Sequence, residues 1–335
     1  MSATMAYVTG ATGFVGSHVA DLLDAQGVPM RLLVRSRARL DSQYHKNTEI
    51  TEGSLDQPPE KLAQGLKNAT HIFHIAGLIG AIRQEEFDHV NIEGTRNLIE
   101  AVRMSGTMPQ RFVLVSSLAA HGPSSSHKEP RLEHHESAPR TMYGRSKLAG
   151  EKLAVELCAR YGIPLTVIRP TGVYGPRDRA TFELFKFMAR GIELGVGGGP
   201  RHFDLIHGRD LARGIVMAAH SERAINQAYY LTDEGRHELG TVLGILRDVM
   251  APKLNIRLNI PVFMAASLAR INDALQSMTG TLRLPNSDKL EELLAPSWCC
   301  SGEKARRDFG FACEVPLRDG LAETAKWYKD AGWLR

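Results

Sequence analysis

The sequence predicts an α/β protein, a doubly wound parallel sheet followed by a smaller, mostly helical C-terminal lobe. In the first half of the 335-residue chain, short β-branched apolar runs alternate strictly with helical segments. Such alternation indicates a parallel sheet covered on both faces. Beyond about residue 176 it gives way to helical patterns separated by Gly and Pro. We therefore place a domain boundary near residue 175, with the sheet domain over 1–175 and the second lobe over 176–335.

The elements of the sheet domain follow one another with short connections. Each strand is a short apolar run, and each helix shows apolar residues at a spacing of three or four. The strands are expected over residues 5–10, 30–34, 49–53, 70–77, 111–117 and 164–170. The helices are expected over residues 15–27, 60–69, 90–106 and 141–162.

A glycine-rich turn, TGATGFVG, joins the first strand to the first helix. Gly10 permits a tight turn, Gly13 lets a pyrophosphate approach the backbone, and Gly16 lets helix and strand pack closely. The N–H groups at the start of the helix then face the phosphates. The alternative is a plain tight turn, but the strand–turn–helix context favours a Rossmann-type dinucleotide site. The expected cofactor contacts in this turn are Gly10, Thr12, Gly13, Phe14 and Val15.

The end of the second strand carries arginine where an acidic residue would favour NAD. An acidic side chain there would accept hydrogen bonds from the ribose 2′-OH. Instead Arg35 follows the strand, with Arg37 and Arg39 behind it. Arginine suits a 2′-phosphate through charge-assisted bonds, so NADP(H) is the favoured cofactor. NAD(H) remains the alternative, with the arginines as a solvated basic loop.

Tyr143 and Lys147 lie four residues apart at the front of a predicted helix. The fifth strand ends at Ser116–Ser117, and both regions should reach the same end of the sheet. A phenol with a pKa of about 10 transfers protons poorly at neutral pH. A neighbouring ammonium, together with the positive charge of an oxidised nicotinamide, is expected to lower that pKa. An ordinary half-exposed helix surface is the alternative.

Several segments together resemble the extended short-chain dehydrogenase/reductase family. They occur in the order of that family and are TGATGFVG (9–16), HIAG (74–77), VNIEGTRNL (90–98), SSLAAHG (116–122), YGRSK (143–147) and RPTGVYGP (169–176). The resemblance implies that Ser117 binds the substrate oxygen and Tyr143 exchanges a proton. It also implies that Lys147 holds the nicotinamide ribose while a hydride moves between cofactor and carbinol carbon.

Other positions carry over from the family with less specific chemistry. Ser54 stands where relatives commonly have Asp, which removes one expected acceptor near the adenine. Asn91 is expected at the start of its helix, in either a structural or a chemical role. The further cofactor contacts implied by the resemblance are Ser54, Leu55, Ala76, Gly77, Pro170 and Val173.

Two departures from the family's sugar-nucleotide enzymes favour a different substrate. Dehydratases carry an Asp–Glu pair where this chain has Leu118–Ala119. Epimerases place an arginine against the diphosphate where this chain has Phe203, although a slipped loop could restore Arg201. The second lobe also interleaves Phe, Met and Leu at helical spacing. The pattern fits either core packing or the wall of a lipophilic pocket.

The sequence therefore predicts an NADP(H)-dependent oxidoreductase that interconverts a carbonyl and an alcohol on a fairly apolar or aromatic small molecule. It is nearest the branch of dihydroflavonol reductases and hydroxysteroid-type dehydrogenases. The first alternative is a nucleotide-sugar epimerase with tightly bound cofactor. The second is a redox-sensing binding protein, which the Ser117, Tyr143 and Lys147 set disfavours. Relatives commonly dimerise through the Tyr143 helix and the helix before it, so we expect a homodimer.

Composition excludes other classes of protein. A net charge of +4 with scattered signs disfavours nucleic acid, and no apolar segment is long enough to span a bilayer. Cysteines without metal-ligand spacing and the lack of a signal peptide predict a cytoplasmic protein. No metal is expected, because His127, His134 and His135 lie in a polar loop. His121 is expected near the substrate, in contact with it or packed, and Glu133 is expected to be surface charge.

Overall fold

A seven-stranded sheet forms the centre of the computed structural model, which describes residues 4–40, 44 and 47–334. Its order is β11-β6-β5-β4-β1-β2-β3, and all neighbours are parallel. The order reverses between β1 and β4, the point at which doubly wound sheets bind their ligands. The strands are β1 (Ala6–Thr9), β2 (Met30–Val34), β3 (Thr48–Glu52), β4 (His71–His74), β5 (Arg111–Val115), β6 (Leu165–Pro170) and β11 (Gln227–Leu231). The predicted fold class is confirmed.

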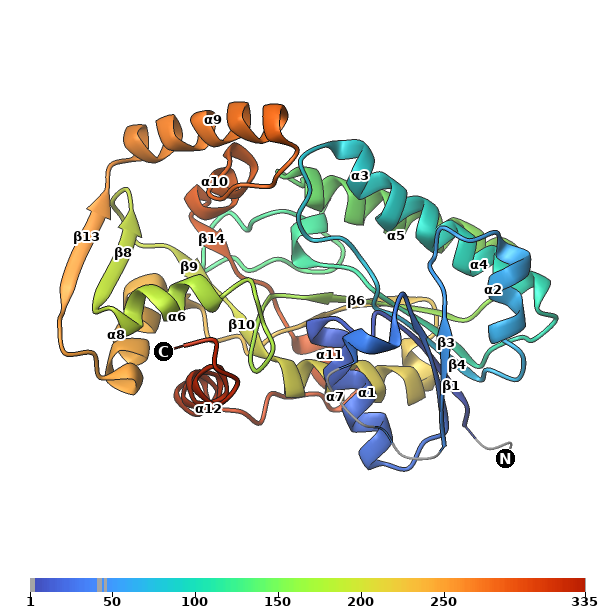
Figure 1. Ribbon diagram of the computed structural model, residues 1–335. Coiled ribbons are helices and arrows are strands. Elements are labelled where there is room, and N and C mark those ends of the chain that lie inside the picture. Colours follow the sequence, from blue (N-terminus) through green and yellow to red (C-terminus); the bar gives the residue numbers. More distant parts are fainter. Residues whose placement is uncertain (1–3, 41–43, 45–46, 335) are drawn as a thin grey trace.

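Helices cover both faces of this sheet (Figure 1). Side chains alternate along each strand, so Ala6 and Val8 enter one core while Tyr7 enters the other. One face carries α1 (Phe14–Ala25), α7 (Gly208–His220) and α11 (Glu303–Phe309). The other carries α2 (Pro59–Gly65), α4 (Gly94–Met104) and α5 (Met142–Tyr161).

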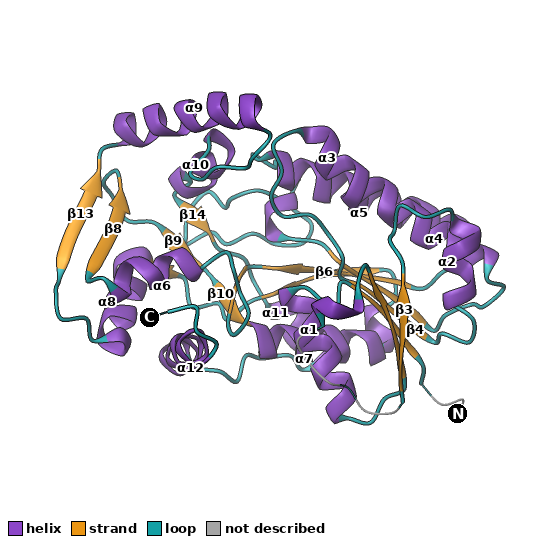
Figure 2. Ribbon diagram, in the orientation of Figure 1, coloured by secondary structure: helices purple, strands orange, loops and turns teal. Residues whose placement is uncertain are grey.

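The second lobe is mostly helical, as Figure 2 shows. Its core lies between α6 (Phe182–Ala189), α8 (Leu239–Met250) and α12 (Leu317–Asp330). An outer pair of helices, α9 (Val262–Thr279) and α10 (Ser287–Leu294), packs around a smaller cluster. Short strand pairs connect these parts: β7 (Gly172–Tyr174) with β10 (Leu205–His207), β8 (Ile192–Val196) with β13 (Ile256–Ile260), and β9 (His202–Phe203) between β12 (His237–Glu238) and β14 (Ser297–Trp298).

The sheet layer also uses residues that the predicted boundary at 175 assigned to the second lobe. β11 hydrogen-bonds along the whole of β6, and α7 packs against the same core as α1. Tyr229, Tyr230 and Leu231 are fully buried there, so without β11 the apolar edge of β6 would be open to water. A cut at residue 175 therefore does not separate the sheet from the second lobe.

The helix expected over 90–106 begins earlier than predicted. α3 (Gln84–Asp88) runs through a π-helical turn, His89–Glu93, directly into α4. Asn91 consequently lies inside a continuous helix and not at its start, so the expectation of an N-terminal position is wrong.

Candidate active site

The carboxyl ends of the central strands meet at one edge. Thr9 of β1 pairs with His74 of β4, which pairs with Leu114 of β5. Val115 pairs in turn with Ile168 of β6. The segments that follow these strands, which contain most of the predicted site residues, therefore emerge side by side. This edge is where open parallel sheets bind ligands.

The glycine turn has the close packing that its spacing predicts. Gly10 has φ +79°, and a Cβ there would lie 2.7 Å from the backbone N of Ala76. A Cβ on Gly16 would lie 2.0 Å from the Gly10 carbonyl oxygen, so helix and strand touch through backbone alone. Gly13 is exposed and begins α1 without a side-chain cap, which leaves the first-turn N–H groups available to an anion. The turn therefore fits a pyrophosphate, with Thr12, Phe14 and Val15 partly buried around it.

Arg35 directly follows β2 and is exposed. It forms no hydrogen bond or ion pair with the described part of the chain, whereas Arg37 donates to the carbonyl oxygen of Ile50 at 2.9 Å. The backbone N–H of Arg37 is also bound, to Glu52 at 2.9 Å. Arg35 is thus an exposed cation at this strand end, and Arg39 is another, four residues later.

The strand end beyond β3 holds its polar groups in local contacts. The Ser54 hydroxyl donates to Asp56 at 2.9 Å, so an acceptor missing at position 54 is present two residues later. Asp56 also faces His89 at 3.1 Å. Leu55 is buried, and its carbonyl oxygen accepts from Asn97 at 2.8 Å.

Tyr143 lies in the first turn of α5, whose start is fixed by the Thr141 hydroxyl accepting from the N–H of Gly144 at 3.0 Å. Its side chain lies near enough to Ser117 for that hydroxyl to influence its pKa, and its ring lies 6.2 Å from that of Phe87. Burial raises the pKa of Tyr143 to about 12, against the lowering effect of the Ser117 hydroxyl. In the cofactor-free chain desolvation is the largest influence on this pKa, and the expectation that Lys147 together with an oxidised nicotinamide lowers it stays a prediction.

Lys147 is buried one turn further along α5. Its Nζ donates to the carbonyl oxygen of Val115 at 2.7 Å, and it lies 3.4 Å from where a Cβ on Gly77 would stand. Burial lowers the pKa of Lys147 to about 8, while the nearby Glu151 carboxylate opposes that shift. The ammonium therefore lies between the end of β5 and the exposed backbone of Gly77, within reach of a ligand over that glycine.

Asn91 fastens the loop after β4 to α5. Its Oδ1 accepts from the N–H of Leu78 at 2.8 Å, and its Nδ2 donates to Ser146 at 2.9 Å. Asn91 lies in the π-helical turn, and its backbone carbonyl oxygen accepts a hydrogen bond from the Thr95 hydroxyl at 2.8 Å. A Cβ on Gly150 would lie 2.3 Å from that oxygen, so the π-helical turn and α5 pack closely here. Asn91 positions the loop that carries Ala76 and Gly77.

A buried ion pair beneath the site was not predicted. Arg169, the next-to-last residue of β6, donates to both carboxylate oxygens of Glu151, and both side chains are less than a tenth exposed. Glu151 is four residues after Lys147, and its carboxylate is the negative charge that partly offsets the lowering of the Lys147 pKa by burial. A Glu one turn beyond the lysine and an Arg inside an apolar strand were the available signals.

His121 belongs to the same buried polar group. Its Nδ1 lies 2.8 Å from the Tyr230 hydroxyl, and burial lowers the pKa of His121 to about 4. Arg169 lies over the Tyr230 ring at 5.8 Å. Glu133 is not simply surface charge, because its carboxylate accepts from the backbone N–H of Tyr230 at 3.2 Å.

The remaining predicted positions lie beyond β6. Pro170 is buried at the end of β6, and Val173 is partly buried in β7. Between them, the hydroxyl oxygen of Thr171 is buried without a hydrogen-bond partner in the described chain. An unpaired buried hydroxyl is costly unless a ligand satisfies it, so this strand end also fits a bound polar group.

The histidines of the polar loop have ordinary contacts. His127 stacks on His202 with ring centroids 3.9 Å apart, and His135 accepts from the N–H of Leu132 at 3.2 Å. Over residues 4–40, 44 and 47–334, no group of three or more His, Cys, Asp or Glu is arranged to hold a metal ion. Within the same residues, none of the helices combines the length and apolarity that crossing a bilayer requires.

Comparison with known proteins gives the family. The family model for the NAD dependent epimerase/dehydratase family matches residues 6–231. Ceramide reductase of Caulobacter vibrioides is 34% identical over 333 residues, covering 98% of this chain and 95% of the relative. The 4-hydroxy-2-methyl-3-oxo-4-farnesyl-3,4-dihydroquinoline-1-oxide ketoreductase of Stigmatella aurantiaca is 27% identical and covers 94% of both chains. The UDP-glucose 4-epimerase of Thermotoga maritima, solved with UDP-glucose, superimposes with a TM-score of 0.77 at 20% identity, covering 98% and 99%. The chain is therefore an enzyme of the NAD dependent epimerase/dehydratase family, within the extended short-chain dehydrogenase/reductases.

Proposed function

We propose that the protein is an NADP(H)-dependent oxidoreductase that reduces a carbonyl to an alcohol, or reverses that reaction, on an apolar or aromatic small molecule. The observation that carries the chemistry is the nearness of Ser117 and Tyr143 at the carboxyl edge of the sheet, with Lys147 buried one turn away. A protein that only bound the cofactor would not need a phenol and a hydroxyl aligned there. An enzyme is therefore favoured over a redox-sensing binding protein.

Burial keeps the Tyr143 phenol protonated in the cofactor-free chain, and the positive charges of Lys147 and of an oxidised nicotinamide would have to lower its pKa for efficient proton exchange. At neutral pH its phenol is protonated, so it can donate to the oxygen of a carbonyl that is gaining negative charge. Ser117 orients that oxygen, and the charge of Lys147 stabilises the phenolate that remains after transfer. The bound nicotinamide cofactor supplies the hydride. Glycine-turn N–H groups, Gly77, Lys147 and Thr171 are the groups of this chain that would hold the cofactor.

Arg35 supports the phosphorylated cofactor. It is exposed at the end of β2 and unpaired with the described residues, whereas Arg37 is held by β3. A guanidinium in this position can bind a 2′-phosphate with two parallel hydrogen bonds. NAD(H) lacks that phosphate, so the Arg35 guanidinium would not contribute to its binding in this way.

The geometry of β9 supports an apolar substrate over a nucleotide sugar. Phe203 pairs with Trp298 of β14 and His237 of β12, which fixes the register of the segment. Arg201 donates to the carbonyl oxygen of Val196 at 2.5 Å, so it holds the turn after β8. A slip that would bring Arg201 to the diphosphate position would break both arrangements. Relatives named for a ceramide and a farnesylated quinoline point the same way.

A nucleotide-sugar epimerase is the second candidate, since the fold of the Thermotoga maritima UDP-glucose 4-epimerase matches nearly the whole chain. The test is a screen of apolar ketones and aldehydes with NADPH or NADH, with UDP-glucose epimerisation measured in parallel. We expect NADPH oxidation that Tyr143→Phe abolishes while cofactor binding persists, and a loss of preference for NADPH in Arg35→Ala. Preference for NADH in the unaltered protein, or epimerisation without carbonyl reduction, would overturn the proposal.

A cytoplasmic homodimer formed through α4 and α5 stays a prediction. Val155 on α5 and Met104 on α4 are exposed apolar side chains on those helices. Sedimentation of the purified chain measures the oligomeric state.

A further inference from the structure

The outer face of α9 exposes an unusual number of large apolar side chains. Met278 is 83% exposed and Phe263 is 71% exposed, and five further apolar side chains of the helix are exposed to a smaller fraction. The exposed apolar residues of α9 are Val262, Phe263, Met264, Leu268, Ile271, Leu275 and Met278. Such contiguous apolar surface on a globular protein marks a contact site.

The sequence of α9 places these side chains on one side of the helix. Met264, Leu268, Ile271, Leu275 and Met278 recur at intervals of three or four. The buried alanines of the helix, Ala265 and Ala269, pack in the cluster shared with α10 instead. Figure 1 shows α9 as the outermost layer above α10, with no element beyond it. The small residues therefore pack inward, and the large apolar ones face outward.

The apolar surface continues on either side of α9. Before the helix, Leu254, Ile256 and Leu258 are exposed on and near β13. After it, Leu282 and Leu284 are exposed in the loop to α10. We call residues 253–284 the α9 face.

Charge on the α9 face is one-sided. Residues 253–284 contain four cations, Lys253, Arg257, Arg270 and Arg283, and a single carboxylate, Asp273. Asp273 already accepts hydrogen bonds from Gln276 at 3.1 Å and from Ser287. Arg257 is paired with Glu193 at 3.2 Å. Lys253, Arg270 and Arg283 are exposed and form no ion pair with the described residues, so residues 253–284 carry a positive charge, whereas the acidic residues Asp288, Glu291 and Glu292 lie on α10.

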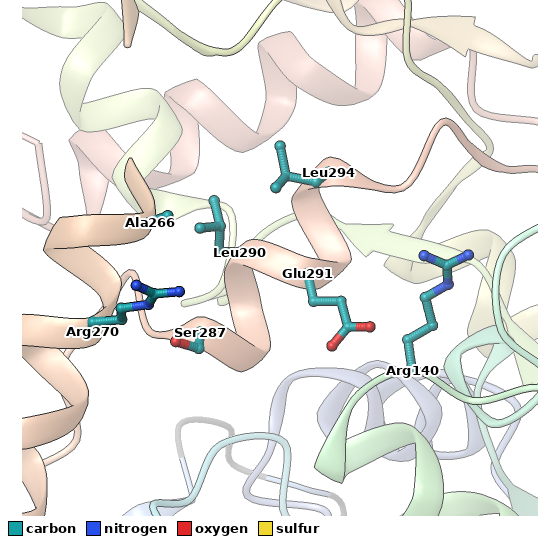
Figure 3. A pocket seen from close by; sticks show the side chains of 7 residues that line it. All are labelled: Arg140, Ala266, Arg270, Ser287, Leu290, Glu291 and Leu294. Carbon is teal, nitrogen blue, oxygen red and sulfur yellow. The ribbon is translucent and has the colours of Figure 1, made fainter. Parts of the chain in front are cut away.

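Arg270 of the α9 face and the exposed Arg140, which precedes α5, line an open pocket of about 370 Å³ under α9. Figure 3 shows Arg270 on one side of α10 and Arg140 on the other, with Glu291 between them. The pocket floor includes Leu290 and Leu294. The lining thus combines apolar side chains with two guanidinium groups and one carboxylate, and Arg270 lies on its α9 side.

α10 links this region to the catalytic tyrosine. The Asp288 carboxylate of α10 accepts from the backbone N–H of Met142 at 2.8 Å, one residue before Tyr143. The Glu292 carboxylate on the same helix is near enough to raise the pKa of Tyr143. A Cβ on Gly80, in the loop after β4, would lie 3.1 Å from Leu282 of the α9 face. The α9 face thus borders the same site from outside.

We propose that the α9 face binds the surface of an anionic lipid bilayer, with the apolar side chains of α9 among the acyl chains and Lys253, Arg270 and Arg283 at the headgroups. An amphipathic helix with basic flanks lies in such an interface without spanning it. A second copy of the chain is disfavoured, because two faces with the same positive charge would repel. This amends the expectation that no membrane is a partner: no described helix spans a bilayer, but one can lie on it.

The test is flotation of the full chain with vesicles of phosphatidylcholine alone or an equal mixture with phosphatidylglycerol. We expect flotation with the anionic vesicles only, weakened by salt. Arg270→Gln with Arg283→Gln should reduce partitioning about thirtyfold, from the usual contribution of a basic side chain at an anionic surface. Leu268→Asn with Ile271→Asn should also abolish flotation.

Met108→Asn is the matched control, because Met108 is 62% exposed but lies just before β5, at the opposite edge of the sheet. It should float like the unaltered protein. Every variant should keep the thermal stabilisation that the cofactor gives, which shows that the fold and the dinucleotide site are intact. Equal flotation of all variants would overturn the proposal. It would also be overturned if the unaltered protein did not float and formed a dimer that the double variant Leu268→Asn/Ile271→Asn dissociates. Neither result would bear on the carbonyl chemistry, which is measured separately.

Discussion

Replacing Lys147 by Met should remove a pH dependence of stability that the buried ammonium creates. In the folded protein burial lowers the pKa of Lys147 from 10.5 to about 8. Between these two values the unfolded chain binds more protons than the folded one, so the free energy of unfolding rises with pH. Well below pH 8 the folded protein bears the full cost of the buried charge, and above pH 10.5 it bears none.

The size of the effect follows from the two pKa values. At about 1.4 kcal/mol per tenfold change in proton affinity, the cost is about 3 kcal/mol at pH 7 and about 1 kcal/mol at pH 10. The unaltered protein should therefore gain about 2 to 3 kcal/mol between pH 7 and pH 10 relative to Lys147→Met. Other titrating groups are the same in both proteins, so they cancel in this difference.

The assay is urea unfolding of the cofactor-free proteins at both pH values. The m-value should be the same for both, which shows that the same surface is exposed on unfolding. Lys147→Met should also lose turnover, although it need not lose stability at pH 7, because the charge it removes is unfavourable to folding. Equal pH dependence in the two proteins would mean that Lys147 titrates normally and is not desolvated as its position indicates.

The remaining predictions concern packing and the ion pair. Gly16→Ala should prevent folding, because its Cβ would lie 2.0 Å from the Gly10 carbonyl oxygen, whereas Gly198→Ala, with nothing within 4 Å, should express and melt normally. Soluble yield and thermal melting measure both, and a folded Gly16→Ala would contradict the close packing. Glu151→Gln should cost about 3–5 kcal/mol in urea unfolding, because it leaves Arg169 buried without its counter-charge. Glu156→Gln, which breaks an exposed pair, should cost less than about 1 kcal/mol, and equal losses would refute the distinction.

Much of the sheet domain could be predicted from local patterns. The strand over 30–34 has the predicted bounds, and the glycine spacing of 10, 13 and 16 matches a turn in which two of the three positions have no room for a Cβ. These features depend on neighbours in the chain, because an apolar run or a tight turn limits backbone geometry within a few residues. The positions of Ser117, Tyr143 and Lys147 follow from the same reasoning, since each is fixed relative to a strand end or a helix start.

Only the tertiary structure decided the environment of those side chains. The sequence places Lys147 one turn from Tyr143, but burial is the largest influence on the pKa of the phenol in the cofactor-free chain. β11 joins the sheet beside β6 although 56 residues, 171–226, separate the two strands in the chain, and Glu151 meets Arg169 from a different element. The outward apolar face of α9 has the same helical spacing as a core helix and differs only in what covers it. Desolvation, distant pairing and exposure all depend on which segments surround a residue, and no local spacing in the sequence records that.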